Sequence, residues 1–185
     1  MTIETPIIET PRLRLRPLEL GDAEAIQTVF PKWEIVEFLS NNVPWPYPSD
    51  GALTFIRDIA LPAVERGVEW HWSIRPRKMP EKLIGVISLM KKPNDNRGFW
   101  LDPSWQAQGL MSEASAAVTD FWFEVLEQPV LRVPKAVANE RSRRISERSG
   151  MRVVETMNRE YVSGCLPSEI WEITRKEWEE HTRPL

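Results

Sequence analysis

Residues 100–114, WLDPSWQAQGLMSEA, run from a strand-like apolar segment through a short loop into the start of a helix. Pro103 ends the strand because proline has no backbone N–H to donate, and Gly109 stands just before the helix. The first turn of a helix carries unpaired N–H groups and a partial positive charge, so it can bind phosphate. One glycine is fewer than the known phosphate-binding loops contain. Residue types alone therefore support anion binding and an ordinary strand–loop–helix connection about equally.

The segments around this stretch predict one domain over residues 1–185, of the α/β (α+β) class. Residues 12–18 alternate basic and apolar side chains at period two, which is typical of a half-buried strand. Further strands are expected at 69–74, 82–90, 97–101, 130–138, 152–156 and 170–174, with a hairpin-like stretch at 160–164. Helices are expected at about 22–29, from 49 or 50 to 66 with a kink at Pro62, at 108–126 and at 141–149. An antiparallel meander that leads into a helix and another strand indicates a sandwich with a mixed sheet.

Composition excludes several classes of protein. With 24 Lys and Arg against 27 Asp and Glu, the net charge is −3, so the chain as a whole is not basic enough to favour nucleic-acid binding. It has no apolar run approaching the roughly 20 residues that span a bilayer, and residues 1–6 do not read as a secretory signal. The single cysteine, Cys165, cannot form an internal disulfide, so we expect a reducing, cytoplasmic setting.

The chain has nine tryptophans, and most are expected to pack in the core or at its rim. Residues 44–48, PWPYP, cannot form a helix or a central strand because three prolines lie within five positions. This stiff, extended loop carries Trp45 and Tyr47. Histidine is a common acid or base in enzymes, but His71 lies between two tryptophans on an expected strand and is expected to point outward or to pack there.

The central run Gln106-Ala107-Gln108-Gly109-Leu110-Met111 resembles the acetyl-CoA motif of the GCN5-related N-acetyltransferases (GNAT). That pattern is Gln or Arg, two residues, Gly, one residue, then Gly or Ala. Residues 100–114 resemble more narrowly the ribosomal-protein N-terminal acetyltransferase (RimJ/RimL-like) subgroup. Residues 10–18, 44–48, 139–142 and 150–151 are similar to other segments of that subgroup, in the same order. Gln108 stands where Arg or Lys is common, Met111 replaces Gly or Ala, and Met151 replaces Phe.

The resemblance implies a mixed, mostly antiparallel central sheet that splays around the cofactor and is flanked by helices. It implies direct transfer of an acetyl group from acetyl-CoA to a primary amine in a ternary complex, without a metal, by a monomer or homodimer. The acceptor is either a protein N-terminus or a small molecule such as a polyamine, amino acid or antibiotic. Because of Gln108 and Met111, a catalytically silent acyl-CoA-binding module is the competing hypothesis.

The resemblance also assigns roles to individual residues. The cofactor-binding residues are expected to be Trp100, Leu101, Gln106, Ala107, Gln108, Gly109, Leu110, Met111, Ser112 and Asn139. The expected catalytic residues are Ser142, which would protonate the thiolate, and Glu160, which would help to deprotonate the amine through water. Trp45 and Tyr47 are expected to line the acceptor cleft. Taken without the resemblance, Asn139 is a helix N-cap, Ser142 a solvent-facing serine, Glu160 a surface glutamate, and Trp100 and Leu101 sheet core.

Overall fold

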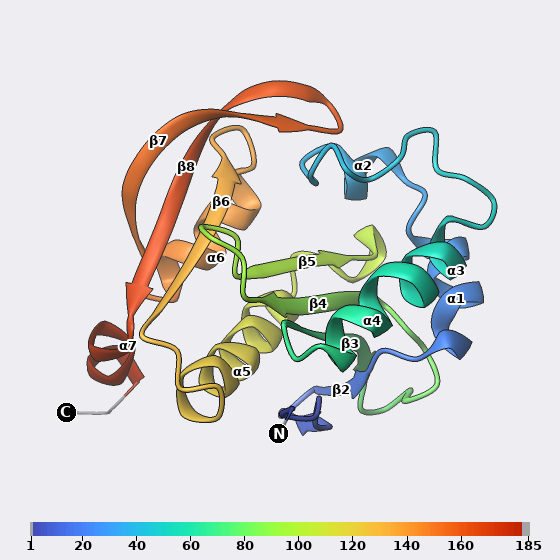
Figure 1. Ribbon diagram of the computed structural model, residues 1–185, viewed down its shortest axis with the longest axis horizontal. Helices are drawn as coiled ribbons and strands as arrows, with labels where there is room; N and C mark the ends of the chain where they lie inside the picture. Colours follow the sequence, from blue (N-terminus) through green and yellow to red (C-terminus); the bar gives the residue numbers. More distant parts are fainter. Residues whose placement is uncertain (1, 183–185) are drawn as a thin grey trace.

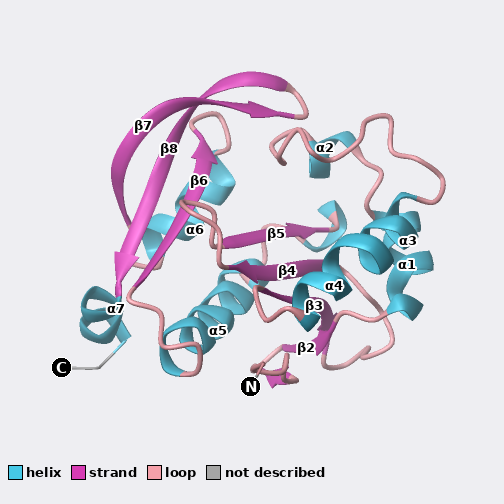
Figure 2. Ribbon diagram, in the orientation of Figure 1, coloured by secondary structure: helices cyan, strands magenta, loops and turns pink. Residues whose placement is uncertain are grey.

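The computed structural model describes residues 2–182, and Figures 1 and 2 show two sheets with helices packed around them. The larger sheet has the order β1-β2-β3-β4-β5 and the smaller one the order β6-β8-β7. Every ladder that joins neighbouring strands in the described chain is antiparallel. The strands of the larger sheet are β1 (Ile8–Glu9), β2 (Leu13–Pro17), β3 (Glu69–Pro76), β4 (Gly85–Met90) and β5 (Arg97–Leu101). Those of the smaller sheet are β6 (Val130–Ala136), β7 (Arg152–Tyr161) and β8 (Gly164–Thr174).

Helices cover both faces of the larger sheet (Figure 1). Helix α5 (Leu110–Glu124) packs on one face, where it buries a core shared with β6 and β8. The opposite face carries a second core beneath α1 (Ala23–Val29), α2 (Trp33–Val36), α3 (Gly51–Phe55) and α4 (Leu61–Glu65). Helix α6 (Glu140–Arg148) follows β6, and α7 (Arg175–Thr182) follows β8. Within residues 2–182, no helix is both long and apolar enough to cross a membrane.

Strand β3 shows how residue alternation separates the two cores. Trp70, Trp72 and Ile74 are almost fully buried on the α5 side, and the Trp72 ring meets the edge of Phe121 on α5 at a centroid distance of 5.5 Å. The intervening positions face the other helices because successive side chains of a strand point to opposite faces. His71 is one of these, and it is buried against Glu69, with 2.8 Å between its Nε2 and the Glu69 Oε2.

The predicted fold class is confirmed, and most of the predicted tryptophan packing with it. The helix expected up to residue 66 is divided into α3, a π-helical turn (Ile56–Ala60) and α4. Pro62 lies in the first turn of α4, where its missing N–H costs no helical hydrogen bond. Strand β7 was expected to stop at residue 156 but runs on to Tyr161, because it pairs with β8 along its whole length. Helices α2 and α7 were not predicted.

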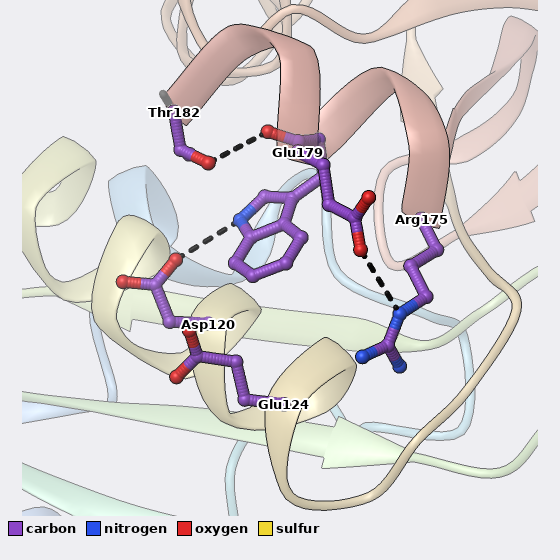
Figure 3. A pocket seen from close by; sticks show the side chains of 6 residues that line it. Asp120, Glu124, Arg175, Glu179 and Thr182 are labelled. Atoms are coloured by element: carbon purple, nitrogen blue, oxygen red, sulfur yellow. Dashed lines mark hydrogen bonds and ion pairs between the residues drawn. The ribbon is translucent and has the colours of Figure 1, made fainter. Parts of the chain in front are cut away.

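Helix α7 is held by a capping box and by one aromatic stack. The Thr174 N–H donates to the Glu177 carboxylate at 2.8 Å, and the Glu177 N–H donates to the Thr174 hydroxyl at 3.2 Å. Trp178 stacks on Phe123 of α5 at 5.1 Å and donates from Nε1 to Asp120 at 3.0 Å. Figure 3 shows Arg175 and Glu179 of α7 facing α5 across the hollow that these residues line.

Replacing Glu177 with glutamine is expected to lower the free energy of unfolding at pH 7 by about 0.5–1 kcal/mol, because a cap is weakened at an exposed site. Hydrogen bonds from Arg152 and from the Thr174 N–H lower the pKa of Glu177 to about 2, below the ~4.3 of an unfolded glutamate. This contribution is therefore present above about pH 5 and disappears as the pH falls toward 2. Denaturant unfolding at pH 7 and pH 3 measures it, with Glu180→Gln on the same helix as the control. If the parent and Glu177→Gln differ in free energy of unfolding by the same amount at both pH values, the stabilisation does not come from the ionised Glu177 carboxylate.

Candidate functional site

The two sheets meet at one end and separate toward the other, which leaves a gap between β5 and β6. Where they meet, the Asn96 N–H donates to the Arg132 carbonyl at 2.8 Å, and the Arg132 N–H donates to the Asn96 side chain at 2.8 Å. No ladder joins β5 to β6 beyond this point in the described chain. Figure 1 shows the two strands running in different directions from the junction. The splayed arrangement that the resemblance implied is therefore present.

Alternation along β5 decides which backbone groups face the gap. The Asp102 N–H donates to Ile84 at 2.7 Å, and the Met90 N–H donates to Asn96 at 2.9 Å. These bonds place residues 96, 98, 100 and 102 at the hydrogen-bonded positions of the β4–β5 ladder. The N–H of Trp100 therefore points toward β4, whereas the N–H of Leu101 points toward the gap. Of these two expected cofactor-binding residues, Leu101 is the one whose N–H is directed toward the gap and could donate to a thioester carbonyl there.

The loop between β5 and α5 brings unpaired backbone N–H groups to the same end of β5. Gly109 is the N-cap of α5 with φ 76°, and Ala107 is also left-handed with φ 61°. The first N–H groups of α5 have no acceptor within the helix. The side chains of Leu110 and Met111 are buried in the main core, while residues 107–109 are exposed. Met111 therefore fits where the family pattern has Gly or Ala, because its side chain turns away from the exposed loop.

Arg12 on the loop before β2 clamps this loop, a contact that residue patterns did not single out. Its Nη1 donates to the Gln108 carbonyl at 2.8 Å, and its Nε donates to Glu113 in the first turn of α5 at 2.7 Å. Thr10 donates to the same carboxylate at 2.6 Å. Burial opposes ionisation of Glu113, but these hydrogen bonds outweigh it and lower its pKa. A guanidinium thus lies beside the loop even though Gln108 replaces the common Arg or Lys.

Gln106 bridges the mouth of the gap. Its Nε2 donates to the Leu101 carbonyl at 2.9 Å, and its Oε1 accepts from Arg141 of α6 at 2.6 Å. The side chain of the motif's first residue therefore links β5 to the start of α6. Arg141 was not among the expected site residues, although it lies beside Asn139.

Helix α6 starts at Asn139, whose side-chain oxygen accepts from the Ser142 N–H at 3.3 Å. The N-cap interpretation of Asn139 is confirmed, and its side-chain NH₂ remains able to donate to a ligand. Ser142 is only 6% exposed, so the interpretation of Ser142 as a solvent-facing serine is wrong. Ser146, one turn later, is fully buried, and its hydroxyl has no partner among the described residues.

Glu160 lies near the end of β7 opposite Cys165 of β8. Glu160 is exposed, which agrees with its interpretation as a surface glutamate. A hydrogen bond with Glu160 raises the pKa of the Cys165 thiol. The role of Glu160 as a base stays a prediction.

The two aromatic rings of the proline-rich loop have different surroundings. Tyr47 packs edge-on against Phe30 at 4.9 Å, and burial raises its pKa to about 12. Phe30 in turn contacts Trp100 at 5.1 Å, so these rings connect the loop to β5. Trp45 is 41% exposed and lies 5.8 Å from Trp33 of α2. Trp45 is thus the more accessible of the two rings, and both substrate contacts stay predictions.

The β7–β8 hairpin closes over the segment that follows α2. The Val162 N–H donates to the Leu39 carbonyl at 3.0 Å, and the Ser163 hydroxyl donates to the Glu37 carbonyl at 2.6 Å. Figure 1 shows the tip of the hairpin reaching from the smaller sheet toward α2. Glu160 and the chain around Trp45 are therefore brought to the same end of the molecule as the gap.

Residues 12–152 match the family model described as the acetyltransferase (GNAT) domain. The chain belongs to the GNAT family. A curated relative from Bacillus subtilis (strain 168), named "Putative ribosomal N-acetyltransferase YdaF", is 31% identical over 104 residues, which cover 52% of this chain and 56% of that protein. The chain thus spans about half the length of this curated relative.

Solved GNAT structures share the fold. RimL, the ribosomal L7/L12 alpha-N-protein acetyltransferase in complex with coenzyme A, has a TM-score of 0.76 at 18% identity, covering 92% of this chain and 97% of RimL. The ribosomal-protein-S5-alanine acetyltransferase of Vibrio fischeri has a TM-score of 0.78 at 14% identity, covering 97% and 100%. RimJ of Mycobacterium smegmatis, in complex with CoA-disulfide, has a TM-score of 0.76 at 16% identity, covering 89% and 83%. These likenesses concern the fold alone.

Proposed function

We propose that this protein transfers an acetyl group from acetyl-CoA to a primary amine, and that the amine is a protein N-terminus. The proposal rests on two sets of backbone N–H donors that lie at the same end of β5. The N–H of Leu101 faces the gap, and the unpaired N–H groups of α5 begin nine residues later. A thioester and a pyrophosphate are the groups that such donors suit.

The residues around the gap fit the cofactor from its phosphates to its thioester. Backbone N–H groups between Gln106 and Ser112 would hold the pyrophosphate, with the guanidinium of Arg12 nearby. The side-chain NH₂ of Asn139, at the opposite wall of the gap, would donate to the pantetheine arm. Since these contacts are mostly to backbone, Gln108 and Met111 are compatible with binding.

The chemistry requires a neutral amine, a stabilised oxyanion and a proton for the departing thiolate. The Leu101 N–H would donate to the carbonyl oxygen as negative charge develops there. The buried hydroxyl of Ser142 would give its proton to the sulfur, and Glu160 would accept the amine's proton through water. Direct transfer of this kind needs no cysteine nucleophile, which agrees with the exposed position of Cys165 on β8.

A protein N-terminus is favoured as the acceptor because RimL is an alpha-N-protein acetyltransferase and the Vibrio fischeri protein acetylates a ribosomal-protein alanine. The exposed ring of Trp45 would be available to contact such an acceptor. A cytoplasmic setting is part of the proposal because ribosomal proteins are made there, and the single cysteine suits a reducing compartment.

Release of free thiol from acetyl-CoA tests the function directly. The protein is incubated with acetyl-CoA and, in turn, with peptides that carry ribosomal-protein N-termini, with polyamines, with amino acids and with aminoglycosides. Thiol release with the peptides, and mass spectrometric detection of an N-terminal acetyl group, is the expected result. Release only with a small amine would overturn the acceptor class, and cofactor binding without release for any amine would favour the silent module.

Replacing Glu160 with glutamine is expected to lower kcat/KM about 10-fold at pH 6–7, because a neutral amide cannot accept the amine's proton. The loss should shrink toward pH 9, where more of the amine is already deprotonated. Steady-state rates over this range measure the effect, with Glu155→Gln, exposed on the same strand, as the matched control. Equal profiles for both variants and the parent would remove Glu160 from the chemistry.

A further inference from the structure

Two buried cations, Lys135 on β6 and Arg97 on β5, lie beside the gap. Lys135 is 7% exposed, and its Nζ lies 4.4 Å from the ring centroid of Phe99, so its side chain reaches from β6 to β5. Arg97 is 2% exposed and donates from Nη1 to Thr119 of α5 at 2.8 Å. The Arg97 Nε has no acceptor among residues 2–182.

Neither cation is neutralised by a carboxylate within the described chain. Asp95 pairs with Arg159 at 2.8 Å, and Glu169, opposite Lys135 in the β6–β8 ladder, pairs with Arg143 at 2.8 Å. Burial, with the charge of Arg97, lowers the pKa of Lys135 to about 7, and burial lowers that of Arg97 to about 10. An unpaired buried cation is costly. An anion bound beside the two cations would offset this cost.

The position of Lys135 identifies which anion suits it. Phe99, its ring partner, is two residues before Leu101 on the edge of β5 that faces the gap. The phosphates of the cofactor would lie farther along the chain, at the far end of the loop between β5 and α5, on the N-terminus of α5. The anion that acetyl transfer creates inside the gap is the thiolate of coenzyme A. This step of the argument rests on the proposed function.

We propose that Lys135 is a further catalytic residue, whose ammonium group stabilises the thiolate of coenzyme A as it leaves. In the transfer, a C–N bond forms to the amine and the C–S bond breaks, with the electron pair remaining on sulfur. The amine's proton leaves by way of water, and the sulfur receives a proton from Ser142. Lys135 supplies charge and exchanges no covalent bond. Arg97 is more deeply buried and is held by Thr119, and its positive charge acts on Lys135.

The test compares coenzyme A with desulfo-coenzyme A, which lacks only the thiol, by calorimetry at pH 6, where Lys135 with its pKa of about 7 is mostly protonated. The parent protein should bind coenzyme A about 10-fold more tightly, because a charge-assisted contact to the sulfur is lost in the analogue. Lys135→Met should remove this preference and lower kcat about 10-fold while leaving KM for acetyl-CoA nearly unchanged. Lys135→Gln should behave in the same way, and thermal unfolding should show both variants to be folded, since each removes a buried charge.

Lys91→Met is the matched control, because Lys91 also lies over an aromatic ring, 5.2 Å from that of Trp70, but this ring belongs to β3 and not to β5. It should keep both the preference and kcat. Equal weakening of both ligands in the Lys135 variants, or a parent protein without the preference, would overturn the inference while leaving acetyl transfer intact. A parent protein that binds neither ligand would overturn the proposed function as well.

Discussion

Gly109→Val should weaken acetyl-CoA binding by about 10-fold or more, because the added side chain and an altered backbone would both disturb the phosphate site. Gly109 has φ 76°, a conformation that a β-branched residue adopts only with strain. A Cβ there would lie 3.4 Å from the Arg12 guanidinium, so the protein itself leaves room for it. The expected loss therefore comes from backbone geometry and from the ligand, and calorimetric titration measures it.

Gly67→Val is the control that distinguishes a loss of acetyl-CoA affinity from the general effect of backbone strain on stability. Gly67 also has a left-handed conformation, with φ 67°, but it follows α4 on the opposite face of the sheet. This control should lose a comparable part of its free energy of unfolding, about 1–2 kcal/mol, and should bind acetyl-CoA like the parent. If Gly109→Val also binds like the parent, the phosphates do not lie on this loop.

Ser142→Ala should lower kcat by about 10- to 1000-fold, because one positioned proton donor contributes on that order. Acetyl-CoA affinity should stay nearly intact, since a single hydroxyl adds little to a ligand held mostly by backbone groups. Ser142 is 6% exposed, and its backbone N–H donates to the side chain of the N-cap Asn139. Pre-steady-state and steady-state rates with a saturating amine measure the effect.

Ser146→Ala is the matched control on the same helix. Its hydroxyl is fully buried and unpartnered among residues 2–182, so its removal should be neutral or stabilising and should leave kcat unchanged. A loss of kcat with Ser146→Ala but not with Ser142→Ala would move the proton donor one turn along α6. Unchanged rates in both variants would leave positioning as the role of this helix.

The sequence predicted those parts of the molecule that local patterns determine. The period-two alternation of β3 separates its two faces, and Asp102-Pro103 ends β5 where the structure ends it. Gly109 and the residues around it predicted the loop and the start of α5, because a left-handed backbone conformation favours glycine. The Thr174-x-x-Glu177 capping box is also a local signal, and it indicates the start of helix α7, which was not predicted.

The rest depends on contacts between distant segments. Arg12 reaches the loop before α5 across about a hundred residues of chain, and alternating arginines on a strand do not show which one does so. In the sequence, Lys135 is an ordinary polar residue of a strand. Only the packing of β6 beside β5 shows that its side chain lies over the ring of Phe99. Glu160 is exposed while the next residue, Tyr161, is buried, and the sequence does not show which face of β7 the rest of the molecule covers. Such positions are determined by tertiary packing.

The structure of the protein crystallised with coenzyme A tests the account most directly. We expect the pyrophosphate of coenzyme A to lie within hydrogen-bonding distance of the N–H groups between Gln106 and Ser112. We also expect the pantetheine arm to lie between β5 and β6, with the sulfur near Ser142 and Lys135. A cofactor bound outside the gap, or with its phosphates away from the N-terminus of α5, would contradict the account.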